Sequence, residues 1–191
     1  MSLRTLRSWA VMLALFAAMV AANVYLGSGP GETFSGKARA VDGDSLELGG
    51  RRVRLYGIDA PEFRQTCEKA GGTTPCGQRA QAELKFMISG KNVECESFGF
   101  DRYDRTLAKC RAGEADLGAA MVRAGWAIAY GDYRSEERAA RRAGAGIWAG
   151  EFIEPADWRV LNGQAAAEIS LWKRFIWPYC CAPATPVIVR H

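Results

Sequence analysis

Alternating apolar and polar positions predict two strands joined by a tight turn in the first third of the chain. The pattern is strand-like over residues 37–48 and returns over residues 51–58, where Val53 and Leu55 alternate with arginines. The Gly49-Gly50 pair between them is typical of a two-residue hairpin turn, because glycine adopts the positive φ angles that such turns require. The two strands are therefore expected to lie side by side.

Helical spacing of apolar residues predicts three helices further along. The first covers residues 78–89. The second follows Asp116 as N-cap and ends at Gly125. The third covers residues 135–143, with Ser135 as its N-cap.

Two more strand-like segments, residues 92–98 and 106–111, lie between the first and second helices, and no clear period follows residue 143. This order of elements predicts an α+β fold. A five-stranded OB-type β-barrel with about three helices packed on it fits best, preceded by an N-terminal hydrophobic segment. The face and loops of such barrels are suited to binding nucleic acid.

Residues 9–26 form the hydrophobic segment, which only Asn23 interrupts and which follows Arg4 and Arg7. This pattern predicts an export signal, either a signal peptide cleaved after Ala22 or an uncleaved membrane anchor. Both alternatives place the domain outside the cytoplasm, secreted, periplasmic or anchored to the membrane through residues 9–26.

The 191 residues, of which 49% are hydrophobic, suit one domain with terminal extensions. We expect a signal peptide or anchor over residues 1–26, a linker over 27–35, a folded domain over 36–159 and a C-terminal extension over 160–191. A monomer is the expected state.

Six cysteines agree with an oxidising compartment. Cys67 and Cys76 are expected to close a Gly- and Thr-rich loop, and Cys95 and Cys110 to pair across neighbouring strands. The adjacent Cys180-Cys181 pair has no assigned partner.

The composition also limits the chemistry. A net charge of +4, carried mainly by arginine, fits an anionic partner, although many secreted domains are equally basic. The one histidine is His191, the last residue, which argues against a hydrolase that uses histidine as base or metal ligand. A bound metal would then need oxygen ligands, which favours Ca²⁺ or Mg²⁺.

Acidic residues and an arginine gather around the predicted hairpin. The turn folds Asp59 back toward Asp44, with Arg54 on the returning strand and Glu62 just beyond. An ideal hairpin would send Asp44 and Arg54 to opposite faces, so the pairing requires a bend at Asp42-Gly43. Asp42 itself is expected to be structural. Paired carboxylates with an arginine suit metal-assisted phosphodiester hydrolysis.

These residues carry a resemblance to a known family. Several short motifs occur in its order and spacing between about residues 36 and 150, and they are strong only in combination. They are Asp42-Gly43-Asp44, Arg54-Leu55, Asp59-Ala60-Pro61-Glu62, the run from Asp101 to Ala108, Leu117 to Gly125, and Gly146-Ile147-Trp148. The chain resembles the staphylococcal nuclease (thermonuclease) family.

The resemblance implies a Ca²⁺-dependent endonuclease that hydrolyses DNA and RNA. It makes Asp44 and Asp59 calcium ligands, with the backbone carbonyl of Ala60 as a third, and Glu62 the general base or the group that orients the attacking water.

It also implies that Arg54 and Arg105 bind phosphate and stabilise the transition state. Tyr103 would contact phosphate, and Tyr130 would pack against a base. Where the family has glycine before this second arginine, the chain has Asp104, which either pairs with Arg105 or strains a turn that prefers glycine.

Two other classes of function each fit part of the sequence. An OB-fold nucleic-acid-binding module with weak or no catalysis would typically lack the acids and arginines kept here. A membrane-anchored interaction protein would explain residues 9–26 but not that constellation.

Overall fold

The structure is a computed structural model that describes residues 9, 12–20, 31–163 and 188–189. The chain divides into two compact units, Met1–Glu32 and Thr33–His191. In the first, residues 12–20 are helical with exposed side chains. Among the described residues, no helix is both long enough and apolar enough to cross a membrane. The rest of the predicted export signal lies outside the described residues.

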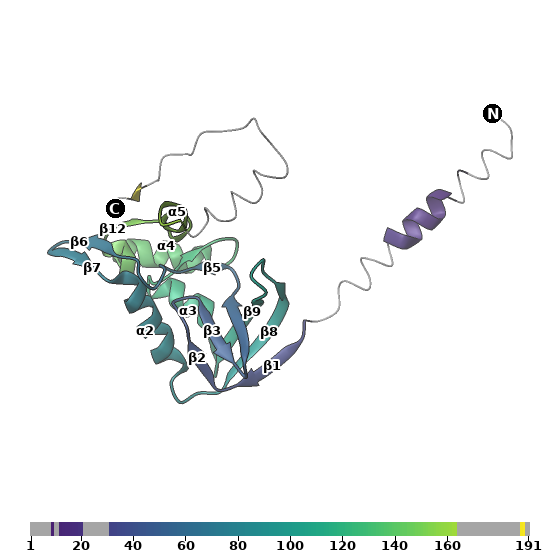
Figure 1. Ribbon diagram of the computed structural model, residues 1–191, viewed down its shortest axis with the longest axis horizontal. Coiled ribbons are helices and arrows are strands. Elements are labelled where there is room, and N and C mark those ends of the chain that lie inside the picture. Colours follow the sequence, from purple (N-terminus) through teal and green to yellow (C-terminus); the bar gives the residue numbers. More distant parts are fainter. Residues whose placement is uncertain (1–8, 10–11, 21–30, 164–187, 190–191) are drawn as a thin grey trace. The chain divides into compact units, whose positions relative to one another are not determined.

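A curled β-sheet dominates the second unit (Figure 1). Its strands follow the order β1-β8-β9-β4-β3-β2, and β10 pairs with β9. β4 and β9 are parallel, whereas the other pairs are antiparallel. The strands are β1 (Thr33–Gly36), β2 (Ala38–Ala40), β3 (Ser45–Leu48), β4 (Arg51–Leu55), β8 (Val93–Phe100), β9 (Thr106–Ala112) and β10 (Ala115–Asp116).

The predicted hairpin is present. Leu48 lies opposite Arg51, so Gly49 and Gly50 form the two-residue turn, with φ angles of 58° and 82°. The segment predicted as one strand over residues 37–48 is divided into β2 and β3 by a bend that contains Asp44. Because Asp44 precedes β3, its side chain does not follow the pleat of the sheet.

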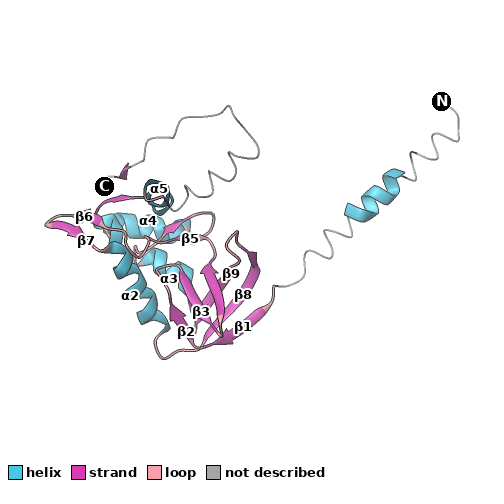
Figure 2. Cartoon of the chain, in the orientation of Figure 1, coloured by secondary structure: helices cyan, strands magenta, loops and turns pink. Residues whose placement is uncertain are grey.

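Helices cover this sheet, as the α+β prediction required (Figure 2). Leu84 of α2 and Met121 of α3 are fully buried in a core that Val53 and Leu55 also enter. Asp116 caps α3 by accepting a hydrogen bond from the Ala119 amide, as predicted. The helices are α2 (Cys76–Ile88), α3 (Leu117–Arg123), α4 (Arg134–Ala143), the 3-10 helix η1 (Gly146–Ala149) and α5 (Pro155–Leu161).

Three predictions about this unit need correction. The sheet includes residues 33–35, which were assigned to the linker, because β1 pairs with β8. The sheet has seven strands among the described residues rather than five, since residues 37–48 form two strands and β1 and β10 lie outside the predicted strand segments. Tyr133, not Ser135, precedes α4, and the Ser135 hydroxyl instead donates to Glu136.

Short strands outside the main sheet connect the loop after Glu62 to α5. β6 (Cys67–Lys69) pairs with β7 (Gly72–Thr74) and with β12 (Gly150–Ile153), and β12 also pairs with β13 (Ile188–Val189). β5 (Ile58–Asp59) pairs with β11 (Ile128–Ala129). The region after residue 143, where no period was found, thus contains η1, β12 and α5.

Both predicted disulfides are present. Cys67 bonds to Cys76 and closes the loop that forms β6 and β7. Cys95 bonds to Cys110, its direct partner across β8 and β9. Cys180 and Cys181 lie outside the described residues.

Candidate active site

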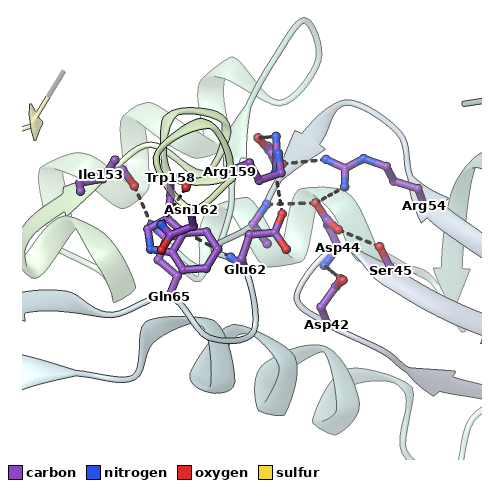
Figure 3. A network of polar contacts seen from close by, with 12 residues as sticks. Asp42, Asp44, Ser45, Arg54, Glu62, Gln65, Ile153, Trp158, Arg159 and Asn162 are labelled. Atoms are coloured by element: carbon purple, nitrogen blue, oxygen red, sulfur yellow. Dashed lines mark hydrogen bonds and ion pairs between the residues drawn. The ribbon is translucent and has the colours of Figure 1, made fainter. Parts of the chain in front are cut away.

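The floor of the candidate site consists of two buried carboxylates that share one guanidinium. Asp44 and Asp59 are only 3% and 6% exposed. Arg54 contacts both of them. Its Nη1 lies 2.8 Å from Asp44 Oδ2 (Figure 3), and its Nη2 lies 2.7 Å from Asp59 Oδ1. The hairpin therefore brings together the residues that the sequence placed there.

Local structure fixes Asp44 in this position. Its amide donates to Asp42 Oδ1, which forms the predicted bend, and its Oδ2 accepts from the Ala60 amide at 3.2 Å. Its Oδ1 accepts a hydrogen bond from the Ser45 hydroxyl. The Asp44 carboxylate is thereby held against the segment that carries Asp59 and Ala60.

Burial and ion pairing shift the pKa values of Asp44 and Arg54. Burial raises the pKa of Asp44 well above its ordinary value, and the attraction of Arg54 only partly opposes this effect. Burial alone would lower the pKa of Arg54, but Asp44 and Asp59 raise it above its usual range. The arginine is therefore charged, while the ionised form of Asp44 lacks enough positive charge around it.

A cleft of about 690 Å³ adjoins this floor through Arg54, which lines it. Five arginines line it, together with three acids and three apolar or aromatic side chains. They are Arg52, Arg54, Arg102, Arg105 and Arg159, then Asp42, Glu62 and Asp101, and finally Tyr103, Leu107 and Tyr130. Such a wall suits an anionic ligand that also carries flat aromatic groups.

Arg105 is held by two partners on different elements. Its Nε donates to Asp101 Oδ2 at 2.7 Å, and its Nη1 donates to the Ser45 hydroxyl at 3.2 Å. The ring of Tyr103 lies 5.4 Å from its Cζ atom. Tyr103 and Tyr130 are both 44% exposed and lie in the cleft wall, where a ligand can reach them.

The structure decides between the two alternatives for Asp104. The acid that pairs with Arg105 is Asp101, which also accepts from the amides of Tyr103 and Arg105. These hydrogen bonds outweigh its partial desolvation and lower the pKa of Asp101. Asp104 occupies the left-handed region instead, with φ of 59°. Aspartate tolerates this conformation better than most residues, although glycine adopts it without strain.

Replacing Asp104 by glycine is therefore expected to raise the free energy of unfolding by up to about 1 kcal/mol and to leave Arg105 in place. Urea denaturation measures this change. Asp104→Ala is the matched control, because it removes the same charge but keeps a Cβ, and it should give no gain. Equal gains in both variants would assign the effect to charge rather than to backbone strain.

Sequence reasoning missed one residue of the site, Arg159 on α5. Its Nη2 lies 2.9 Å from Asp59 Oδ2, and its Nη1 lies 2.8 Å from Glu62 Oε1. Pro155 at the start of α5 and Asp157 in its first turn are recognisable helix signals, but no motif marks the arginine as functional.

Comparison with known proteins finds one family model and several relatives that match the chain. Residues 52–150 match the family model described as staphylococcal nuclease homologue. The chain is 35% identical over 129 residues to the succinoglycan biosynthesis protein ExoI of Rhizobium meliloti (strain 1021), covering 63% of this chain and 68% of that protein. It is 35% identical over 130 residues to an uncharacterized endonuclease of Haemophilus influenzae, covering 62% and 68% of the two chains.

A fungal protein, the probable endonuclease lcl3 of Botryotinia fuckeliana, is 29% identical over 150 residues, which cover 69% of this chain and 56% of that protein. The family model covers most of β4, all of β8, β9 and β10, the Glu62 segment and Arg105, and it begins after Asp44. The chain therefore belongs to the family of staphylococcal nuclease homologues.

Proposed function

We propose that this protein is a hydrolytic endonuclease that cleaves phosphodiester bonds of DNA, RNA or both in the cleft beside Asp44 and Asp59. The observation that carries this proposal is the convergence of these two buried carboxylates on Arg54, beside a wall that holds Glu62 and Arg105. Membership of the family supports nuclease activity, and the curled sheet supports an OB-type barrel.

Calcium is the cofactor that we propose for this floor. The buried carboxylates of Asp44 and Asp59 share the guanidinium of Arg54, and a hard divalent cation would bring further positive charge to them. Within the described parts of the chain, no three histidine, cysteine, aspartate or glutamate side chains converge as a metal cluster. Asp44, Asp59 and the Ala60 carbonyl would hold the ion, together with water and substrate. When bound, calcium supplies charge that neutralises a phosphate oxygen.

Glu62 is the proposed general base. Its carboxylate lines the cleft, and its Oε1 accepts a hydrogen bond from Arg159. Among the described residues, none donates a hydrogen bond to Oε2, so this oxygen can take the proton of an attacking water.

Arg105 is proposed to stabilise the negative charge that develops on the phosphate. Its Nε and Nη1 are fixed by Asp101 and Ser45, whereas its Nη2 has no hydrogen bond to any described residue. A guanidinium fixed in this way donates to a phosphate oxygen with little reorganisation. Arg54, which balances the floor acids, is proposed as the second arginine that contacts phosphate.

Tyr103 and Tyr130 complete the substrate side of the proposal. Both rings are partly exposed in the cleft, where Tyr103 would contact phosphate and Tyr130 would pack against a base. The two disulfides support a setting outside the cytoplasm. Export through residues 9–26 belongs to the same proposal.

Cleavage assays with single-stranded DNA, duplex DNA and RNA test this function. We expect cleavage in Ca²⁺ and none in excess chelator, with activity restored when Ca²⁺ is returned. Equal cleavage in chelator would contradict the metal requirement. Binding without cleavage of any substrate would assign the chain to the nucleic-acid-binding modules instead.

A further inference from the structure

Arg159 contacts two acidic side chains of the site, Asp59 and Glu62, which lie three residues apart in the sequence. Its Nη1 donates to Asp59 Oδ1 at 3.1 Å and to Glu62 Oε1 at 2.8 Å, while its Nη2 donates to Asp59 Oδ2 at 2.9 Å. The side chain is only 23% exposed, and Figure 3 shows it extending from α5 over Glu62. Such partly buried, charge-assisted contacts fix the direction of a carboxylate.

The helix that supplies Arg159 is fastened to the Glu62 segment. Gln65, which is fully buried, donates from Nε2 to the Ile153 carbonyl at 2.7 Å and accepts at Oε1 from the Glu62 amide at 3.1 Å. Ile153 ends β12, two residues before α5 begins. The Gln65 side chain thus holds the start of α5, which carries Arg159, close to the backbone of Glu62.

The disulfide loop supports the same arrangement. Cys67 begins β6, whose residues pair with β12, and its bond to Cys76 fixes β6 to the start of α2. Gly77 there lies so close to the Glu62 carbonyl that a Cβ atom would collide with it. The loop therefore positions α5 and the Glu62 segment together.

Arg159 supplies the positive charge beside Glu62, which Arg54 does not supply. Arg54 is already shared between Asp44 and Asp59. In the part of the chain that the structure describes, Arg159 is the one side chain that pairs with Glu62. Without it, Glu62 would stand beside Asp59 with no counter-charge and with a free choice of rotamer.

We propose that Arg159 is a positioning residue of the nuclease site, which fixes one oxygen of Glu62 so that the other is presented to water. This inference rests on the proposed function. It places part of the catalytic unit beyond residue 150, where the family match ends. Helix α5 is then a functional element of the site.

The test compares the wild type with Arg159→Ala, Arg159→Lys and, as a control, Arg138→Ala, which removes an exposed arginine from α4. Steady-state cleavage of one oligonucleotide in Ca²⁺ gives kcat and KM. For Arg159→Ala we expect kcat to fall about ten- to a hundredfold, with KM within about twofold. Arg159→Lys should recover part of kcat, because it restores the charge and one donor, and Arg138→Ala should match the wild type.

Calorimetric titration with Ca²⁺ provides a measurement that does not depend on cleavage. Arg159 occupies both oxygens of Asp59, so the alanine variant should bind Ca²⁺ as tightly as the wild type or several-fold more tightly. Much weaker Ca²⁺ binding would mean that Arg159 only maintains the fold around Asp59, and it would overturn the proposal.

Two kinetic results would also overturn it. An unchanged kcat would show that Glu62 needs no fixing, and a raised KM with unchanged kcat would make Arg159 a phosphate contact.

If the wild type cleaves nothing, the proposed function fails. If the wild type cleaves and Arg159→Ala is equally active, only the role of Arg159 fails. Should the alanine variant not fold, Arg159→Lys and Arg159→Gln keep the same comparison available.

Discussion

Replacement of Glu62 by glutamine is expected to lower the rate constant for DNA cleavage at saturating Ca²⁺ by about a thousandfold. Glutamine keeps the length of the side chain and an oxygen that can accept the hydrogen bond from Arg159. It cannot take a proton from water. The change therefore removes the base while it leaves the surrounding contacts in place. Single-turnover cleavage of a labelled oligonucleotide measures the effect without interference from product release.

Glu114→Gln is the matched control, because it removes an exposed carboxylate outside the cleft wall. It should cleave at the wild-type rate. Binding of the oligonucleotide to Glu62→Gln in Ca²⁺ should also be unchanged, since the proposed phosphate contacts belong to Arg54 and Arg105. A loss of less than about tenfold would show that Glu62 is not the base.

Much of the floor of the site could be predicted because its residues are close in the sequence. The Gly49-Gly50 turn fixes the register of β3 and β4, and the register brings Asp44 next to the strand that carries Arg54. The need for a bend at Asp42 followed from the pleat alone. A few φ angles determine local geometry of this kind, and residue types such as glycine predict those angles.

Arg159 could not be predicted in the same way. It lies 97 residues from Glu62 in sequence, and its position depends on β12, on the loop closed by Cys67 and Cys76, and on Gln65. Each of these contacts is tertiary, so no spacing or periodicity in the sequence predicts it. The strands of that loop are three residues long, too short to give a period.

The partner of Arg105 could not be predicted from the sequence for a different reason. The turn before Arg105 contains two acids that could pair with the arginine, Asp101 and Asp104. The choice between them depends on backbone angles, because the left-handed conformation of Asp104 closes a turn in which Asp101 accepts from the Arg105 amide and side chain. We had expected only Asp104 as a possible partner of Arg105, since the backbone angles that bring Asp101 to the arginine cannot be read from the residue types.

The second large effect is expected for Asp44→Asn. Asparagine has the same shape, but it brings no negative charge to the proposed calcium position. The cleavage rate should fall about a hundredfold at a Ca²⁺ concentration that half-saturates the wild type. Higher Ca²⁺ should recover part of this loss, because Asp59 and the Ala60 carbonyl remain.

This loss of activity is expected without a loss of stability. The pKa of Asp44 is raised by burial, so the folded protein favours its protonated form, and the stability that this group contributes is lost as the pH rises through the folded pKa. Above the folded pKa the buried charge of Asp44 costs stability, and the uncharged asparagine avoids this cost. Arg54 keeps Asp59 as a partner. In the absence of metal, Asp44→Asn should unfold at a temperature no lower than the wild type.

The central claim is that phosphodiester cleavage takes place at a calcium site built on Asp44 and Asp59. Its most direct test is the initial rate of oligonucleotide cleavage as a function of Ca²⁺ concentration, measured for the wild type and for Asp44→Asn. We expect a saturating curve for the wild type and a curve shifted to at least about tenfold higher Ca²⁺ for the variant. Curves that superimpose, or a wild-type rate that does not depend on Ca²⁺, would contradict the claim.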